Sequence, residues 1–431
     1  MIAYNTAVVL LGCALLGLAA GTVGTFSLLR GRALVADAVG HAALPGVAIA
    51  ALIVATLGGD PRSLPPLLAG AATAGVLGVL AVQALARTGR IREDAAIAIV
   101  LSSFYALGVA ILSWLQTQPG AAQAGLSKFI LGQAAAMRAE DAWVAASVAG
   151  LCLLVCLVMF QRLRAVCFDP DFCRMQGLGV QKVDLLLLGL LVLVCVAGLQ
   201  AVGLILVVAL LVLPAATARL LTFRLPRMLA ISAAIGAICG AAGAWVSALR
   251  PEVPTGAAVV LALAAVFTVA LLLAPERGLL AQVYSHLRRR LAADTEHFLR
   301  AAWEAQEIAG AGPGTAGDRW APIGAVAAAR GWRIGRARRL AFWLAQRGLV
   351  ARADGHVHLT PRGAAAARRA VRAHRAVEHH LLAAGATDIA SADRLADLVE
   401  HGLPPEMAAR LLPEPSALPA SPHQLGERRR P

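Results

Sequence analysis

An aspartate and a histidine four residues apart, Asp37 and His41, lie in a stretch of sequence hydrophobic enough to cross a lipid bilayer. On a helix, side chains at this spacing are neighbours, so a carboxylate oxygen and an imidazole nitrogen could share one divalent ion. The alternative is a neutral His41 that donates a hydrogen bond to Asp37 inside the protein. Ionisable groups at membrane depth are costly and mark functional sites. The pair is therefore the first candidate for contact with a transported ion.

The elements that must position this pair are membrane spans. The sequence of 431 residues is 59% hydrophobic and 15% charged, which excludes an ordinary soluble protein and predicts an all-α polytopic membrane protein. The segment 118–140 is only half apolar, as in a short interfacial or re-entrant helix, and Ala197–Ala201 is the expected turn between spans six and seven. Apolar runs predict about nine transmembrane helices, at residues 7–29, 37–57, 64–86, 94–117, 141–161, 183–199, 201–221, 228–249 and 255–275.

Charge asymmetry between the loops predicts the orientation of the chain. One set of alternate loops holds twelve Lys and Arg, and the opposite set holds four. Because cytoplasmic loops carry the excess of Lys and Arg, the N-terminus is expected outside. The polar C-terminal region, from residue 281 onward, is expected in the cytoplasm, and the spans are expected to contact membrane lipid.

Small residues and a proline indicate how the spans pack. Gly17 and Gly21, and again Gly236 and Gly240, have the Gly-x-x-x-Gly spacing that lets helix backbones touch in lipid. Pro45 removes a backbone N–H inside the second span, and such irregularities are tolerated where protein or a wet cavity surrounds them. We therefore expect a tight helix bundle with an irregularity close to the candidate site.

The chain has seven cysteines, five in predicted spans and two in a loop assigned to the reducing cytoplasm, so we expect no structural disulfides. Cys152 and Cys156 have helical spacing and could bind a soft metal ion. Small apolar-like cysteines are common inside buried helices, and we favour that role here.

Four motifs in order give the chain a resemblance to a known family. The segment Arg32–Ala50, with its Asp-Ala-x-x-His-Ala-x-Leu-Pro-Gly core, resembles the signature of the zinc, manganese and iron class of ABC transporter permeases. The resemblance covers about residues 5–275 and continues through Phe168–Asp184, Gln200–Arg219 and Val253–Gly256. It implies the fold of a type II ABC importer permease in the bacterial inner membrane. It also favours Asp37 and His41 as ligands of the transported metal.

The resemblance also implies partners. These are a cytoplasmic ABC ATPase, an extracytoplasmic metal-binding protein and a second permease chain in a homodimer or heterodimer. The sequence independently requires a separate ATPase, because its two lysines, Lys128 and Lys182, lie outside any Gly-x-x-x-x-Gly-Lys-Ser/Thr loop. We therefore expect a transport subunit that is not an enzyme and that binds no cofactor permanently. Oxygen and nitrogen ligands suit manganese, ferrous iron or zinc without naming one.

The basic loop 161–182 resembles the ATPase-docking segment of these permeases. Asp169 and Pro170, followed by Gly177, predict a short coupling helix within it. The alternative is an ordinary cytoplasmic loop whose positive charges only set the orientation.

The C-terminal region has a pattern of its own. Residues 322–329 predict a short helix and 335–348 a second helix, and an Asp354-Gly355 turn predicts a hairpin after them. This order of elements is typical of a cytoplasmic winged helix-turn-helix domain of α+β class. We expect residues 281–370 to form a linker and the winged-helix-like part, and residues 371–412 to form a helical metal-sensor or dimerisation segment. Residues 413–431 are expected to be a disordered tail. The basic residues that could face DNA are Arg336, Arg338 and Arg339.

This region resembles the metal-dependent repressors of the diphtheria-toxin-repressor and manganese-regulator kind. The match is carried by residues 348–350, 359–363, 374–378 and 398–401. In that family the later motifs supply metal ligands, which implies a set formed by His374, Asp397, Glu400 and His401. A first-helix acidic ligand falls here on Arg300, and a guanidinium cannot bind a cation. We therefore favour a dimerisation or metal-feedback module and expect no nucleic-acid partner.

Two other functions fit parts of the sequence. One is a membrane-tethered, metal-responsive transcription regulator whose helix bundle is mainly an anchor. The other is a secondary metal transporter that needs no ATPase.

Overall fold

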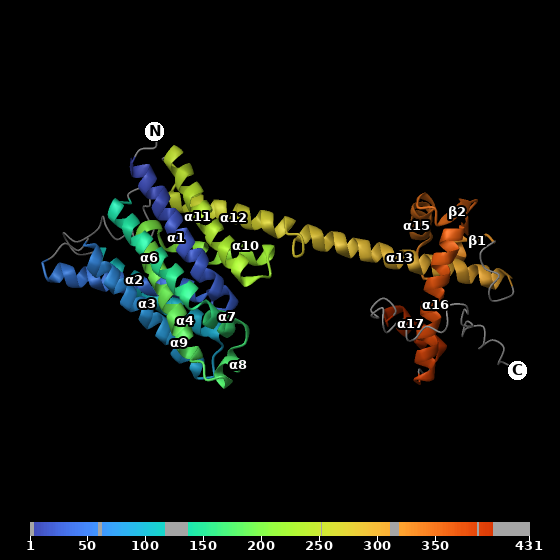
Figure 1. Ribbon diagram of the computed structural model, residues 1–431, viewed down its shortest axis with the longest axis horizontal. Coiled ribbons are helices and arrows are strands. Elements are labelled where there is room, and N and C mark those ends of the chain that lie inside the picture. Colours follow the sequence, from blue (N-terminus) through green and yellow to red (C-terminus); the bar gives the residue numbers. More distant parts are fainter. Residues whose placement is uncertain are drawn as a thin grey trace. The chain divides into compact units, whose positions relative to one another are not determined.

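The computed structural model divides into two compact units, residues 1–282 and 283–431 (Figure 1). Each unit has its own hydrophobic core. The residues that the structure describes are 4–58, 63–116, 137–250, 252–310, 319–385 and 388–399.

The first unit is helical throughout its described residues. Eight of its helices are long and apolar enough to cross a membrane, and α10 adds a shorter apolar stretch, Leu206–Leu221. A short interfacial or re-entrant helix was expected within the segment 118–140. Residues 118–136 of that segment lie outside the described residues. The helices are α1 (Tyr4–Leu29), α2 (Val35–Thr56), α3 (Leu64–Arg87), α4 (Glu93–Gln116), α6 (Ala139–Val158), α7 (Phe160–Phe168), α8 (Pro170–Met175), α9 (Val180–Val202), α10 (Leu204–Leu221), α11 (Leu225–Leu249) and α12 (Thr255–Leu273).

The expected turn at Ala197–Ala201 is wrong, because α9 continues to Val202 before the chain turns. The turn is made at Gly203, whose φ of +85° is readily adopted only by glycine. Its N–H still donates to the carbonyl of Leu199, at 3.2 Å. The segment 197–201 contains no residue that must end a helix, so its Gly198 is tolerated inside α9.

Helix α1 packs against α6, α9, α10 and α11 in the middle of this unit (Figure 1). The contact with α11 is made backbone to backbone at the two predicted glycine motifs. A Cβ atom added to Gly17 would lie 2.1 Å from the carbonyl oxygen of Gly236, and one added to Gly236 would lie 2.1 Å from that of Gly17. No side chain fits between the two helices here, and the predicted close packing is observed.

The second unit combines helices with a small sheet. Strand β3 pairs antiparallel with both β1 and β2, with Val350 of β2 opposite Leu359 of β3. The β2–β3 turn has positive φ at Asp354 and Gly355, as a tight hairpin requires. The elements are α13 (Leu279–Gly310), β1 (Ala321–Pro322), α14 (Ile323–Ala329), α15 (Ile334–Gln346), β2 (Val350–Ala353), β3 (His356–Leu359), α16 (Pro361–Ala383) and α17 (Ile389–Val399).

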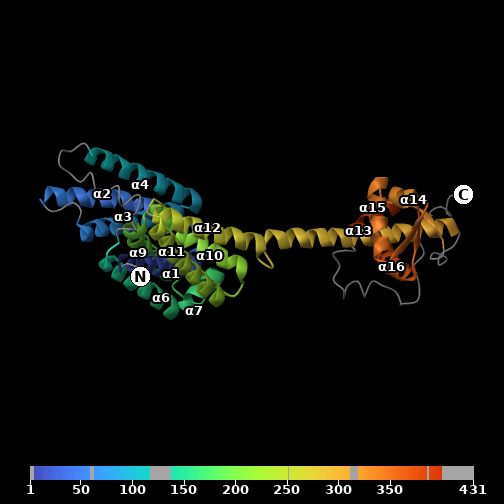
Figure 2. The same ribbon diagram turned by 90° about the horizontal axis from the view of Figure 1, so that it is seen from above.

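Helix, turn, helix and hairpin therefore follow each other as the sequence predicts. Phe298 of α13 and Leu344 of α15 lie in one core with residues of α14, α16 and the strands. Figure 2 shows α14, α15 and α16 gathered around the end of α13. Burial of these apolar side chains holds the second half of α13 against the small sheet and its helices.

We predict that Gly17→Ala destabilises the membrane unit by about 1–3 kcal/mol, because its methyl group would collide with the α11 backbone. The measurement is thermal unfolding of the purified protein in detergent. Gly150→Ala in α6 is the matched control, since an added Cβ there has no neighbour within 4 Å. Equal unfolding temperatures for the two variants would contradict the backbone contact.

Candidate functional site

Asp37 and His41 lie on one face at the start of α2, as their spacing predicts. Asp37 is in the first turn, where the free N–H groups of the helix favour a negative charge. Nε2 of His41 is 3.4 Å from Oδ1 of Asp37, longer than a normal N–H···O hydrogen bond. Nδ1 of His41 is buried and has no hydrogen-bond partner among the described residues. The two groups therefore lie close together without satisfying each other.

Two further helices complete the surroundings of the pair. The His41 ring meets the ring of Tyr105, in α4, edge to face with centroids 5.0 Å apart. On another side, the thiol of Cys195 in α9 donates to the carbonyl of Ala36, at 3.7 Å. The sequence patterns did not indicate Tyr105, because the register between α2 and α4 is a long-range property that no local spacing records.

Pro45 changes the backbone next to His41 although α2 continues through it. Proline has no N–H, so the carbonyl of His41, four residues earlier, does not receive the usual helical hydrogen bond from it. Neighbouring helices pack closely against this part of α2. A Cβ atom added to Gly46 would lie 2.0 Å from the carbonyl oxygen of Gly70 in α3. A Cβ atom added to Gly108 in α4 would lie 3.0 Å from the Pro45 ring. Close packing therefore fixes the backbone around Pro45, where the carbonyl of His41 lacks the hydrogen bond from residue 45.

The pair is not covered within a single chain. The side chains of Asp37 and His41 are 39% and 20% exposed. Three residues of α4 that carry hydroxyl groups are also exposed: Ser102, Ser103 and Tyr105. Asp37 and His41 of α2 and Tyr105 of α4 therefore form a polar strip that is partly exposed in the single chain.

The predicted short helix after Asp169 is present as α8. The Asp169 side chain accepts the N–H of Phe172 at 2.9 Å and so caps α8, and Gly177 follows it with a φ of +73°. Cys173 faces inward, in a small core with Val166 of α7 and Val180 of α9. Two large apolar side chains of α8, Phe172 and Met175, are more than half exposed, as is Phe168 at the end of α7.

In the second unit, His374 of α16 and Asp397 of α17 lie together as expected, and Asp393 joins them. Ligand atoms of these three residues lie within 4.8 Å of one another. Nε2 of His374 is 2.9 Å from Oδ1 of Asp393, and its Nδ1 is 3.5 Å from Asp397. Asp393 precedes Asp397 by one helical turn, a spacing from which it could have been predicted. The other two expected ligands, Glu400 and His401, lie outside the described residues.

Two guanidinium groups enter the same cluster. Nη1 of Arg300, a side chain only 5% exposed, is 2.8 Å from one oxygen of Asp397, and Nη1 of Arg330 is 2.9 Å from the other. Arg300 also lies 3.7 Å from Glu304, whose pKa is raised by burial. Positive charge is therefore already present where a bound cation would have to approach.

The three arginines considered for DNA contact differ in their surroundings. Arg336 forms two hydrogen bonds to the carboxylate of Asp294 in α13, at 2.8 and 2.9 Å. Arg338 and Arg339 are exposed on α15.

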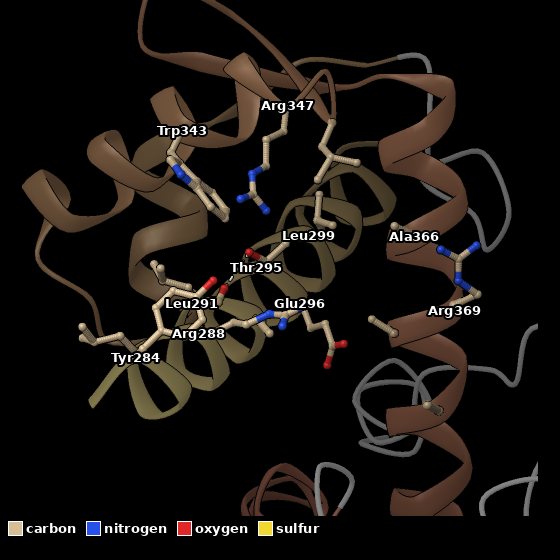
Figure 3. Close-up of a pocket in the computed structure, with 15 residues that line it drawn as sticks. Tyr284, Arg288, Leu291, Thr295, Glu296, Leu299, Trp343, Arg347, Ala366 and Arg369 are labelled. Atoms are coloured by element: carbon tan, nitrogen blue, oxygen red, sulfur yellow. Dashed lines mark hydrogen bonds between the residues drawn. The ribbon is translucent and has the colours of Figure 1, made fainter. Parts of the chain in front are cut away.

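A groove with a volume of about 1180 Å³ lies between α13, α15 and α16 (Figure 3). Arg288, Arg347 and Arg369 line it, and Arg347 lies 3.7 Å from the ring centroid of Trp343. Among the described residues that line it, Glu296 is the only acid, and none is a histidine or a cysteine. This donor set does not suit a metal ion.

Comparison with known proteins identifies the first unit. Residues 3–274 match the model of the ABC 3 transport family. The chain belongs to this family. As an ABC 3 permease it is a transport subunit of the membrane.

Named relatives of this ABC 3 permease include transporters of two metals. It is 39% identical over 303 residues to the manganese transport system membrane protein MntC of Bacillus subtilis, covering 70% of this chain and 68% of that protein. It is 40% identical over 285 residues to the zinc transport system membrane protein TroC of Treponema pallidum, covering 66% and 94%.

A solved structure supports the same fold. The structure described as PsaBC from Streptococcus pneumoniae in complex with Fab matches with a TM-score of 0.56 and 31% identity, over 66% of this chain and 95% of that chain. The prediction of a metal ABC importer permease is confirmed.

Proposed function

This chain is the permease subunit of an ATP-driven importer of divalent metal ions, and we propose that Asp37 and His41 form the transit site for its ion. The proposal rests on the 3.4 Å distance between Nε2 of His41 and Oδ1 of Asp37, which is longer than a normal hydrogen bond. It rests also on the buried Nδ1 of His41, which has no hydrogen-bond partner among the described residues. Two ligands suit transport, because an ion that must leave is bound by a sparse site completed by water or transient ligands.

The cargo is manganese, zinc or ferrous iron on the chemistry of these ligands. A carboxylate oxygen and an imidazole nitrogen suit all three ions. Zinc binds more tightly than the other two at nearly any such site, so selection among them depends on the supply of metal and on the protein that delivers it.

We propose that a second permease chain, in a homodimer or heterodimer, covers the polar strip that contains Asp37, His41 and Tyr105. Ionisable side chains at membrane depth are costly in contact with lipid, and these side chains are partly exposed in one chain. Pairing of two chains across the strip removes them from lipid and brings a second set of ligands to the ion path.

The cytoplasmic ABC ATPase is proposed to dock on α8. Phe172 and Met175 form an exposed apolar face of the kind that marks protein interaction surfaces. A cleft of about 650 Å³ beside α7, lined by Arg164, Phe168 and Arg224 among others, adds positive charge for an acidic partner surface. The positive charges of these loops favour a cytoplasmic location for this side. An extracytoplasmic metal-binding protein would then deliver the ion to the opposite side of the inner membrane.

The second unit is proposed to be a cytoplasmic winged helix-turn-helix domain that serves dimerisation or metal feedback. Its metal response would be weak, because Arg300 and Arg330 already neutralise Asp397. A guanidinium cannot act as a ligand and repels a cation at this distance. The tethered-regulator alternative would use the exposed Arg338 and Arg339, and binding of operator DNA by the detergent-solubilised full chain would favour it.

We predict that Asp37→Asn and His41→Gln together reduce uptake of radioactive manganese and zinc by about 100-fold, since loss of groups that merely orient metal ligands already costs 10–100-fold. The substitutions keep side chains of similar size and remove the carboxylate charge and the imidazole nitrogen. Thr268→Val in α12 is the control, because its hydroxyl donates to the carbonyl of Ala264 in the same helix. Unchanged uptake in the double variant would refute the transit site, and uptake without the ATPase would favour a secondary transporter.

Phe172→Asp with Met175→Asp is expected to weaken ATPase binding about tenfold or more, because exposed apolar anchors carry most of the energy of such interfaces. Co-purification of the ATPase with the permease measures this. Phe342→Asp, which places the same charge on an exposed phenylalanine of α15, is the matched control. Full ATPase retention in the double variant is the result that would exclude α8 as the docking site.

Arg300→Ala is expected to destabilise the second unit by about 1–3 kcal/mol without metal, because Asp397 loses one hydrogen-bonded partner while Arg330 still neutralises it. It should also make the unit respond to manganese, since an ion at about 100 times its Kd adds about 2.7 kcal/mol to the free energy of unfolding. Thermal unfolding with and without manganese measures both effects. Arg336→Ala, which breaks the pair with Asp294 outside the cluster, is the control, and a manganese shift equal to wild type in Arg300→Ala would contradict the cluster's role.

A further inference from the structure

Four charged residues meet where α1 turns into α2. Nε and Nη2 of Arg30 lie 3.0 and 2.8 Å from the two carboxylate oxygens of Asp184, at the start of α9. Nη2 of Arg32 lies 3.2 Å from the same carboxylate, and its Nε lies 3.3 Å from Glu93 at the start of α4. Two positive and two negative groups balance. We call Arg30, Arg32, Glu93 and Asp184 the turn cluster.

The Arg30–Asp184 pair of the turn cluster is less exposed and more fixed in its geometry than a surface ion pair. The side chains of Arg30 and Asp184 are each only 13% exposed. Two parallel hydrogen bonds between a planar guanidinium and a carboxylate fix their relative orientation as well as their distance. By contrast, Arg92 and Asp94, in the loop before α4 and its first turn, are 89% and 69% exposed and 3.8 Å apart. Solvent screens that pair, and its geometry is not fixed.

Arg30 also connects the turn to the α7–α8 segment. Its Nη1 donates to the carbonyl of Val166 in α7, at 3.1 Å. Val166 packs against Cys173 of α8 and Val180 of α9 in a separate small core. One guanidinium group therefore joins the end of α1, the start of α9 and the segment that carries the exposed face of α8.

On its other side, the turn cluster leads directly to the transit site. Gly31 has a φ of +71°, the N–H of Arg32 donates to the carbonyl of Ser27 at 2.9 Å, and that of Gly31 donates to Leu28 at 3.1 Å. This is the Schellman arrangement that ends helices with a fixed backbone. The Ser27 hydroxyl closes it by donating to the carbonyl of Arg32, at 3.0 Å.

The chain stays hydrogen-bonded between this turn and Asp37. The N–H of Val35 donates to the carbonyl of Arg32 at 3.1 Å, and that of Asp37 donates to Leu34 at 3.2 Å. No flexible linker separates the arginines from the first turn of α2, so a movement imposed on Arg30 reaches Asp37 as a movement of the whole turn.

We propose that the turn cluster transmits movement of the α7–α8 segment to Asp37 and His41, and that Arg30 is a positioning residue for metal transport. The inference rests on the docking and transit roles proposed above. When the ATPase displaces α8, Val166 moves with the small core and Asp184 moves with α9, which contributes Val180 to that core. Arg30 follows both groups, and the start of α2 shifts relative to α4. Such rigid displacement of packed elements is a common form of switching.

Arg30→Lys in the complete importer, reconstituted in proteoliposomes with its ATPase and binding protein, tests this. Lysine keeps the charge, but its single ammonium group cannot bond both Asp184 oxygens and the Val166 carbonyl in one geometry. Manganese uptake per ATP hydrolysed should fall about tenfold, a typical size for a lost coupling between sites, while ATP hydrolysis stays within about twofold of wild type. Arg92→Lys, at the exposed pair, should change neither quantity.

Asp184→Asn is the second variant, because it keeps the shape of the side chain and removes its charge. It should uncouple hydrolysis from uptake as Arg30→Lys does. Unchanged uptake per ATP in both variants would overturn the proposal. So would a parallel loss of uptake and hydrolysis, or failure of both variants to assemble with the ATPase, because each of these results assigns the turn cluster to folding alone.

Asp37→Asn in the same vesicles separates this inference from the transit site. If Asp37→Asn leaves uptake intact, the transit site is wrong regardless of Arg30. If Asp37→Asn abolishes uptake while Arg30→Lys leaves uptake per ATP unchanged, only the role of the turn cluster is wrong.

Discussion

Close contact between helix backbones is the constraint on which the membrane unit depends. Lipid tails are as apolar as leucine, so apolar side chains gain little by packing together, and association relies on tight contact and polar bonds. Gly17 and Gly236 bring α1 and α11 to that distance. Because α1 ends in the turn that begins α2, this contact also sets where Asp37 enters the bundle.

The same principle applies beside the candidate site. Gly46 meets the backbone of α3, and Gly108 in α4 meets Pro45, so small residues on three helices enclose the irregular backbone after His41. A polar site in a membrane must be held by rigid surroundings, because each unsatisfied group inside hydrocarbon is costly. Here the surroundings are formed from backbone, which side-chain rotation cannot open.

Local patterns predicted local features, and contacts between distant segments could not be predicted. The Asp37 and His41 spacing, the short helix α8 and the Asp354-Gly355 hairpin each depend on a few neighbouring residues, and the structure contains all three. Tyr105 beside His41 and Asp184 beside Arg30 depend on how α4 and α9 pack against α2 and α1. The turn expected at 197–201 failed for a related reason: a glycine permits a turn without requiring one, and Gly203 was the glycine used.

The Arg30–Asp184 pair also limits how this chain can evolve. Removing one partner of a largely buried ion pair leaves an uncompensated charge, whereas replacing both partners by groups of similar shape is often nearly neutral. Positions 30 and 184 lie 154 residues apart in the sequence, yet a replacement at either one alone removes both hydrogen bonds between the Arg30 guanidinium and the Asp184 carboxylate. Among descendants of this protein the two residues should therefore be inherited together or lost together, and their covariation would record a contact that neither segment reveals alone.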